Sequence, residues 1–202
     1  MTHSSTATIG FTVFVVAALG WRAWETFRKQ GAARGSTSMM WSFYALVGLT
    51  TVIFVGTMLE FFLVSRPFRP AIAVAGVALF GLANWLRIVA IRALDRYWSL
   101  HIEIREQQPL IQQGPYGWVR HPAYSAFVIE HVAVPLVGNA WWSLGLTLLL
   151  YVPMILWRIH KEEAALVAKF GERYRDYQRR VGRLVPRLST LLRSGAVQPD
   201  GS

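Results

Sequence analysis

Two short segments of the chain concentrate the side chains that could carry out chemistry. The first, GPYGWVRHPAY at residues 114–124, places a guanidinium and an imidazole side by side at Arg120 and His121. The proline at position 122 disfavours helix at His121, so both side chains are expected where a loop enters a helix. Such a junction offers free backbone N–H groups and a positive helix end to an anion. Equally, Arg120 could be a topology charge and the aromatic residues could be interfacial anchors.

The second segment is the acidic pair Glu162-Glu163, which follows Arg158 by one helical turn. The chain has 11 acidic residues against 21 lysines and arginines, so a carboxylate pair beside basic residues is unusual in it. The pair could still be a solvated helix face, with Arg158 and Glu162 forming an i, i+4 ion pair. If the two segments meet in space, they enclose a pocket with both signs of charge, which suits a zwitterionic ligand.

The composition disfavours several other kinds of site. The chain has no cysteine, which excludes disulfides, thiolate metal ligands and a cysteine nucleophile. Its five histidines stand singly, without the HxxxH or HExxH spacing of a histidine-ligated metal centre, so no metal site is expected. The net charge of +10 does not follow the pattern of a basic groove with interleaved aromatic residues, so no nucleic-acid partner is expected either.

The elements that must position these segments are expected to be membrane helices. Hydrophobic residues make up 53% of the 202 residues, charged residues only 16%, and the mean hydropathy is +0.33. The predicted fold class is therefore all-α, a polytopic integral membrane helical bundle. With about 20 apolar residues for each span, the sequence predicts about five transmembrane helices. They cover residues 8–24, 40–64, 70–91, 123–137 and 140–158.

The distribution of lysine and arginine predicts the orientation of these spans. Most of these residues fall in the loops 22–39 and 92–122 and in the tail after residue 157. Under the positive-inside rule, those parts are cytoplasmic and the N-terminus is outside. In the tail, Phe170, Tyr174, Tyr177 and Val181 follow one another at helical spacing with basic residues between them. This spacing predicts a cytoplasmic amphipathic helix that lies on the membrane or on the protein's own cytoplasmic end.

The two chemical segments, taken together, resemble a known family. The stretch LIQQGPYGWVRHPAY, followed after a hydrophobic hairpin by EEAALVAKFGERYRDYQRRVGRLVP, is similar to the isoprenylcysteine carboxyl methyltransferase family and its bacterial relatives. Phospholipid N-methyltransferases share this pattern. The resemblance covers about residues 92–187. It implies a methyltransferase core in 92–187. Hydropathy places N-terminal membrane spans in 1–91, and the polar C-terminal residues predict a disordered tail in 188–202.

The resemblance implies an integral membrane enzyme that uses S-adenosyl-L-methionine and has its active site on the cytoplasmic side. Carried over by position, the residues that enclose the cofactor would be Leu110, through its backbone, Tyr116, His121, Tyr124, Glu162 and Glu163. Arg120 would hold the methyl acceptor, with Arg158 as a second candidate. The acceptor would be the carboxylate of a lipophilic or isoprenylated molecule among the membrane lipids, and a bacterial inner membrane is favoured over the endoplasmic reticulum.

Other functions remain open on the sequence alone. If the acceptor were a lipid amine, a base such as His121 or a glutamate would be needed, because an ammonium must lose a proton before it attacks. A small transporter would use polar residues inside the spans. The candidates for that role are Glu60, Asn84, Arg87, Glu130 and His131. A non-catalytic membrane scaffold would need none of these groups.

Overall fold

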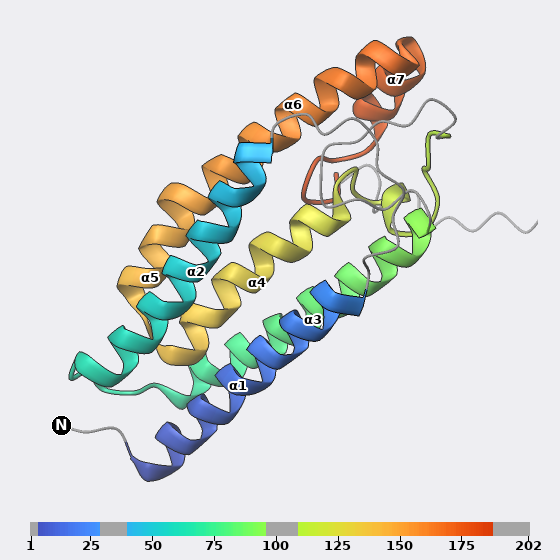
Figure 1. Ribbon diagram of the computed structural model, residues 1–202. Helices are drawn as coiled ribbons and strands as arrows, with labels where there is room; N and C mark the ends of the chain where they lie inside the picture. The colour runs from blue at the N-terminus through green and yellow to red at the C-terminus, as the bar shows by residue number, and fades with distance from the viewer. Residues whose placement is uncertain (1–3, 29–39, 96–108, 188–202) are drawn as a thin grey trace, which may run out of the picture.

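The computed structural model describes residues 4–28, 40–95 and 109–187 (Figure 1). The predicted disordered tail, 188–202, lies outside these residues. Within them, regular structure is helical apart from one parallel bridge between Val119 and Gly182. The α-helices are α1 (Ser5–Arg28), α2 (Met40–Leu63), α3 (Pro70–Leu94), α4 (Pro122–Gly138), α5 (Trp141–Leu146), α6 (Val152–Phe170) and α7 (Glu172–Arg180). A 3-10 turn covers Gly114–Gly117, and a π-helical turn, Thr147–Tyr151, joins α5 to α6.

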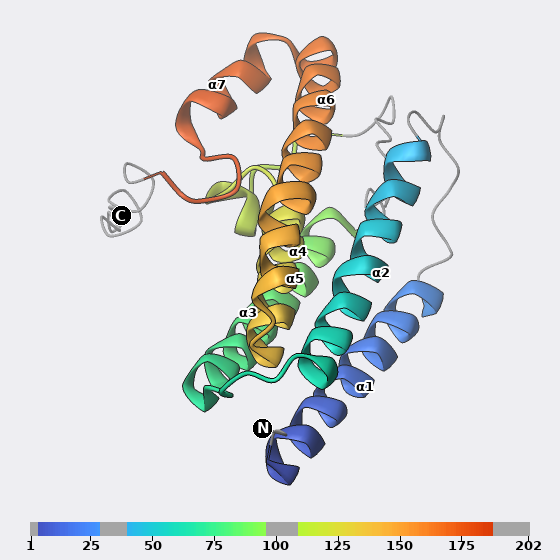
Figure 2. The same ribbon diagram turned by 90° about the vertical axis from the view of Figure 1, so that its left-hand side faces the viewer.

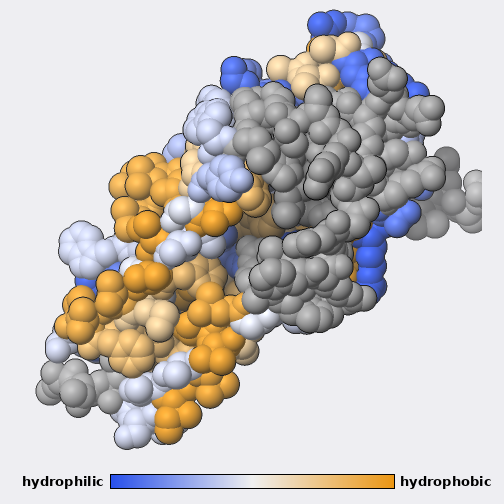
Figure 3. Space-filling view, viewed as in Figure 1, coloured by the Kyte–Doolittle hydropathy of each residue, from blue (hydrophilic) through white to orange (hydrophobic). Residues whose placement is uncertain are grey.

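Three of the described helices are long and apolar enough to cross a bilayer. They are Trp41–Leu63, Pro70–Leu94 and the continuous helix Trp141–Phe170, and the shorter apolar helices Ser5–Trp21 and Pro122–Gly138 run among them (Figure 1). Large apolar side chains on these helices face outward and cover much of the visible surface (Figure 3). A surface of this kind requires hydrocarbon rather than water around it. The prediction of a helical integral membrane protein is therefore confirmed.

The last long helix extends well beyond the span predicted at 140–158. It continues through α6 to Phe170, a length of 30 residues. At 1.5 Å per residue this is about 45 Å, whereas the hydrocarbon core of a bilayer is about 30 Å thick. The helix is therefore longer than the hydrocarbon core of a bilayer, and its second half carries Glu162 and Glu163.

Small residues allow α3 and α4 to lie in close contact along their length (Figure 1). A Cβ atom built on Gly76 of α3 would lie 2.7 Å from the backbone nitrogen of Val137 in α4 and 2.9 Å from the carbonyl oxygen of Ala133. Both helices also carry fully buried alanines, among them Ala83 and Ala126. In membranes, where lipid is as apolar as the side chains, such close backbone approach is a main source of helix association.

Polar side chains inside the bundle join the helices to one another. Arg87 of α3 forms an ion pair of 2.5 Å with Glu130 of α4, and its guanidinium also donates to Asn84. The ring of His131 makes a 2.8 Å hydrogen bond with the hydroxyl of Thr50 in α2. Buried charges in a membrane are tolerated when they are paired in this way. Of the polar residues that a transporter could use, Arg87, Glu130 and His131 thus form contacts between helices.

A carboxylate of α2 caps the start of α5. Glu60 accepts hydrogen bonds from the backbone N–H groups of Trp142 and Ser143, each at 3.0 Å. It also pairs with Arg66 at 2.7 Å. A negative charge at a helix N-terminus complements the unpaired N–H groups and the helix dipole. This contact fixes the turn between α4 and α5 against α2.

The C-terminal helix α7 is folded back from the end of α6 (Figure 2). The reversal occurs at Gly171, whose φ of 57° lies in the left-handed region that favours glycine. The apolar face of α7, with Tyr174, Tyr177 and the following Val181, packs against Leu110 and the end of α6. The apolar residues of this helix therefore face the protein itself in the described part of the chain.

Candidate functional site

The start of α4 is held in place by the chain that follows α7. Residues 181–187, here called the return segment, run back beside the turn that contains Arg120 and His121 (Figure 2). The backbone N–H of Arg120 donates to the carbonyl of Gly182 (2.8 Å), and that of His121 donates to the carbonyl of Arg183 (3.1 Å). Two of the backbone N–H groups at this junction are therefore bonded within the protein. The sequence around Arg120 does not show these bonds, because the carbonyls of Gly182 and Arg183 lie about 60 residues further along the chain.

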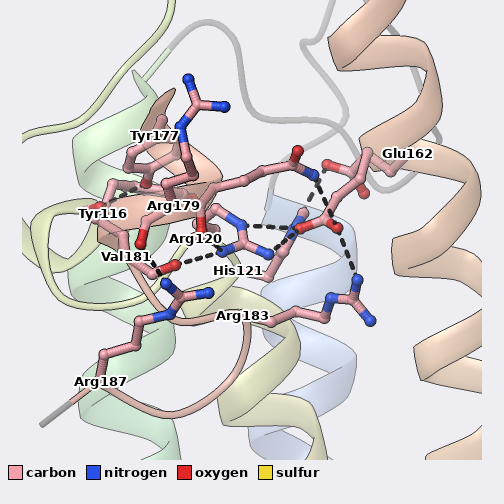
Figure 4. Close-up of polar contacts among 11 residues, drawn as sticks. Tyr116, Arg120, His121, Glu162, Tyr177, Arg179, Val181, Arg183 and Arg187 are labelled. Carbon is pink, nitrogen blue, oxygen red and sulfur yellow. Dashed lines mark hydrogen bonds and ion pairs between the residues drawn. The ribbon is translucent and has the colours of Figure 1, made fainter. Parts of the chain in front are cut away.

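The guanidinium of Arg120 is buried and points into the protein (Figure 4). Its Nε and one terminal nitrogen lie 2.9 and 2.8 Å from one oxygen, Oε1, of Glu163. Its other terminal nitrogen donates to the carbonyls of Gln178 (3.1 Å) and Val181. A guanidinium fork engaged in this way binds a carboxylate and two carbonyls of the same chain.

The imidazole of His121 lies between the two carboxylates of the acidic pair. Its Nε2 is 3.1 Å from Oε1 of Glu163, and its Nδ1 is 4.0 Å from Oε1 of Glu162. Glu163 and His121 are 42 residues apart in sequence. The structure therefore brings together the two segments whose meeting the sequence left as a condition.

The two glutamates have different surroundings although they are adjacent in sequence. The second oxygen of Glu163, Oε2, accepts hydrogen bonds from the side chains of Gln178 (3.2 Å) and Arg183 (3.0 Å) (Figure 4). The side chain of Glu163 is only 5% exposed, whereas that of Glu162 is 28% exposed. The sequence predicts no role for Gln178 or Arg183, because both lie in the tail, whose charges are interpreted as determinants of membrane topology.

Arg158 and Tyr124 form a second contact between α6 and α4. The Nε of Arg158 donates to the hydroxyl of Tyr124 at 2.9 Å, and a terminal nitrogen donates to the hydroxyl of Ser42 in α2, also at 2.9 Å. The residue Arg158 is 3% exposed. The rings of Tyr124 and His121 have centroids 5.8 Å apart, so this contact adjoins the acidic pair. No feature of the sequence pointed to Ser42.

Tyr116 lies where the loop before α4 meets α7. Its carbonyl accepts a 2.5 Å hydrogen bond from the hydroxyl of Tyr177. Burial raises the pKa of the Tyr116 phenol, and the nearby charge of Glu162 raises this pKa further. The phenol of Tyr116 is therefore neutral and able to donate a hydrogen bond throughout the physiological pH range.

Leu110, the remaining predicted cofactor residue, lies on the side of the loop that faces α7. It packs against the aromatic face of that helix and borders a cleft of 730 Å³. Charged side chains of α7 line the opposite wall of this cleft. The lining residues are Ala93, Pro109, Leu110, Ile111, Gln112, Gln113, Gly114, Arg173, Asp176 and Arg180. The structure therefore brings together the other predicted site residues, whereas Leu110 borders a neighbouring space.

Comparisons with known proteins identify relatives of the segment that carries this site. A family model described as the isoprenylcysteine carboxyl methyltransferase (ICMT) family matches residues 75–168. An uncharacterized protein of Bacillus subtilis, YpbQ, is 26% identical over 70% of this chain and 82% of its own length. The protein-S-isoprenylcysteine O-methyltransferase of Saccharomyces cerevisiae is 28% identical over 56% of this chain and 48% of its own length. The methanethiol S-methyltransferase of Mycobacterium tuberculosis is 38% identical over 35% of this chain and 28% of its own length.

A solved structure shares the fold. The eukaryotic intramembrane Ras methyltransferase ICMT matches with a TM-score of 0.58 at 22% sequence identity, over 71% of this chain and 52% of that one. This chain thus spans about half or less of the length of the named methyltransferases that it matches. Residues 75–168 thus match the model of the isoprenylcysteine carboxyl methyltransferase family, and the chain is similar to proteins named as methyltransferases of that kind.

Proposed function

We propose that this protein is an integral membrane methyltransferase that transfers a methyl group from S-adenosyl-L-methionine to the carboxylate of a lipophilic or isoprenylated acceptor. The observation that carries the proposal is the placement of His121 between Glu162 and Glu163 at the end of a membrane-embedded bundle. The match to the family model supports the reaction, and the names of several relatives support an isoprenylated acceptor. The name of the mycobacterial relative, a thiol methyltransferase, makes the acceptor the part most in need of a direct test.

The residues around Glu162 fit the cofactor in charge and chemistry. S-Adenosyl-L-methionine, when bound, supplies an electrophilic methyl group on a sulfonium and carries an ammonium. The partly exposed carboxylate of Glu162 suits a cationic ligand, and the rings of Tyr116 and Tyr124 can face positive charge. His121, held by Glu163, provides a further polar group at the same place. Leu110 borders the neighbouring cleft, so its backbone would take part only if the cofactor extends from Glu162 to that cleft.

Arg158 is the better candidate for the acceptor carboxylate. Arg120 already binds the carboxylate of Glu163 and two backbone carbonyls. Arg158 instead donates to the hydroxyls of Tyr124 and Ser42, which are weaker acceptors than a carboxylate. It precedes Glu162 by one helical turn, so acceptor and cofactor would bind side by side. An acceptor carboxylate is already ionised at neutral pH, so the site needs to align the reactants at about 3–3.5 Å and exclude water rather than supply a base.

We further propose that the bundle crosses the membrane five times, with the site on the cytoplasmic side of a bacterial inner membrane. Three helices meet the length and hydropathy of a span, and α1 and the 17-residue α4 lie among them (Figure 1). Local thinning of the bilayer allows a short helix such as α4 to span. The basic residues of α7 and the return segment favour the cytoplasmic side for that end.

The proposed activity is tested by incubating the purified full-length protein with methyl-labelled S-adenosyl-L-methionine and a panel of acceptors. The panel contains a farnesylated cysteine derivative, an isoprenoid acid, phosphatidylethanolamine and an alkyl thiol. We expect labelled product from a lipophilic acid, released as methanol by mild base because it is an ester. A base-stable product from the amine or the thiol would replace the carboxylate in the proposal, and failure of the protein to bind the cofactor would reject methyl transfer altogether.

A further inference from the structure

Glu163 connects two parts of the chain through its two oxygens. Oε1 receives the guanidinium of Arg120 and Nε2 of His121 at the start of α4. Oε2 receives the side chains of Gln178 in α7 and Arg183 in the return segment. A carboxylate offers about four lone-pair sites. With these donors in place, Glu163 has no acceptor capacity left for a ligand.

Arg120 strengthens the same connection from the other side. Besides binding Glu163, its guanidinium donates to the carbonyls of Gln178 and Val181. The backbone of His121 is at the same time bonded to the carbonyl of Arg183. The start of α4 and the return segment are therefore joined by side chains and by backbone, around one buried carboxylate.

We propose that Glu163 and Arg120 are positioning residues that fasten the return segment to the start of α4 and so hold the His121 ring toward Glu162. They bind neither the cofactor nor the acceptor. This inference rests on the proposed function, because the geometry that they hold is that of the proposed cofactor site. It assigns the return segment, through Arg183, a part in cofactor binding although none of its residues reaches Glu162 in the described contacts.

The contrast with Glu162 supports this division of roles. Glu162 is 28% exposed, and its Oε1 lies 4.0 Å from the nearer nitrogen of His121. It is the carboxylate of the pair that an incoming cation can approach. Burial of Glu163 among its donors means that removing its charge leaves Arg120 and Arg183 without their shared partner, which is costly in a buried site.

The test is a double-mutant cycle on cofactor affinity with Glu163→Gln and Arg183→Gln, measured by calorimetry on the full-length protein in detergent. We expect each single variant to raise the Kd for S-adenosyl-L-methionine about tenfold, as loss of a hydrogen bond to a charged group does. The double variant should raise it no further than about tenfold, because both changes break one connection. Arg175→Gln is the matched control. Arg175 is an exposed residue of α7 that pairs with Glu172 and not with Glu163, so the Kd of this variant should stay unchanged.

Effects of the two changes that multiply to about a hundredfold would overturn the proposal, because they would show independent roles. An unchanged Kd in Arg183→Gln would overturn it as well. If Glu163→Gln fails to fold, Arg183→Gln alone tests the proposal. The Arg183 side chain is 44% exposed, so its loss should leave the melting temperature of the ligand-free protein unchanged. Arg183→Lys, which keeps a charged donor, should restore part of the affinity.

A separate measurement distinguishes failure of this proposal from failure of the proposed function. If the fastening exists, Glu163→Gln increases trypsin cleavage at Arg179 and Arg180 whether or not any cofactor binds. Increased cleavage in a protein that never binds S-adenosyl-L-methionine would reject the proposed function and leave the fastening in place. Unchanged cleavage together with normal cofactor binding would reject the fastening alone.

Discussion

Among single residues, Arg120 and Arg158 show that burial of a guanidinium does not by itself define its role. Both are largely buried, at 7% and 3% exposure. Arg120 binds a carboxylate and carbonyls of its own chain, whereas Arg158 binds two hydroxyls. Only a guanidinium whose partners are replaceable by a stronger acceptor suits an incoming carboxylate. The partners, rather than the residue type, therefore distinguish a structural arginine from a ligand-binding one.

Arg158→Gln is expected to lower kcat/KM for the acceptor by about tenfold to a hundredfold, the effect of losing hydrogen bonds to a charged group. The Kd for S-adenosyl-L-methionine should change little. The kcat/KM of Arg158→Lys should lie between that of the wild type and that of Arg158→Gln, since lysine keeps the charge but lacks the planar fork. Steady-state kinetics with the best acceptor of the panel, combined with calorimetry, measures both quantities. A loss of cofactor affinity with unchanged acceptor kinetics would show that Arg158 binds the cofactor rather than the acceptor.

The titration of the buried Tyr177 in α7 predicts how the stability of the protein changes at alkaline pH. Burial raises the pKa of its phenol, although the charges of Arg120 and Arg180 act in the opposite direction. Since the folded-state pKa exceeds the unfolded value, the stabilisation is complete below about pH 10 and is lost as pH rises above it. We expect the free energy of unfolding to fall by about 1.4 kcal/mol for each pH unit above 10 for each such tyrosine.

Detergent-based unfolding between pH 9 and pH 11 measures this slope. Tyr177→Phe removes the titrating group and should make the slope shallower by about 1.4 kcal/mol per pH unit. The exposed Tyr44→Phe is the matched control and should leave the slope as it is. Equal slopes in the wild type and in Tyr177→Phe would show that the phenol of Tyr177 is not protected by the fold.

At the level of helices, the contact between α3 and α4 depends on residues that have almost no side chain. Gly76 admits the backbone of Val137, and buried alanines continue the contact along both helices. The ion pair of Arg87 with Glu130 adds a polar contact between the same two helices. The residues that form the site lie beyond the end of this pair. Their placement therefore depends on the alignment of α3 and α4.

Gly76→Ala should separate α3 from α4, because the added Cβ would lie within 2.7 to 2.9 Å of backbone atoms and the Val137 side chain. Overpacking of this kind typically lowers the free energy of unfolding by about 1–3 kcal/mol. The matched control is Gly81→Ala on the same helix, where a Cβ would meet nothing within 4 Å. Melting temperatures in detergent measure both changes. A Gly76→Ala protein as stable as Gly81→Ala would show that the interface is looser than the structure indicates.

How much the sequence could predict depended on whether a feature is local. Apolar runs of spanning length are local, and the predicted spans coincide with α1 to α4 and with the joined helices α5 and α6. The pairing of Arg87 with Glu130 is not local, since 43 residues separate them. The return segment is a similar case, because its bonds to Arg120 and His121 come from residues that the sequence pattern showed only as a basic tail.

The candidate site was predictable in membership but not in roles. The motif placed His121 with Glu162 and Glu163, and the structure brings the three together. Adjacent residues on a helix point about 100° apart, so the two glutamates have different neighbours. Glu163 meets Arg183 and is buried, whereas the side chain of Glu162 is 28% exposed. This difference depends on where Arg183 returns. That position follows from the packing of α7 on the loop at Leu110, which no local pattern specifies.

For the whole molecule, the distribution of polarity defines an axis. Outward-facing apolar side chains cover one part of the visible surface and hydrophilic residues cover the end that carries α7 (Figure 3). The start of α1 lies at the opposite end of the bundle (Figure 1). An acceptor with an apolar tail would keep that tail in the membrane while its carboxylate reaches Arg158 at the polar end. This arrangement requires the two ends to face different compartments.

The absence of cysteine makes that requirement directly testable. Single cysteines are introduced at Ser4, an exposed residue before α1, and at Lys161, an exposed residue near the end of α6. In intact bacterial cells, a membrane-impermeant maleimide should label Ser4→Cys at once and Lys161→Cys only after lysis, because the positive-inside rule places the basic end in the cytoplasm. The cysteine-free parent gives the background. Labelling of Lys161→Cys but not Ser4→Cys in intact cells would invert the topology, and equal labelling of both would contradict an odd number of spans between them.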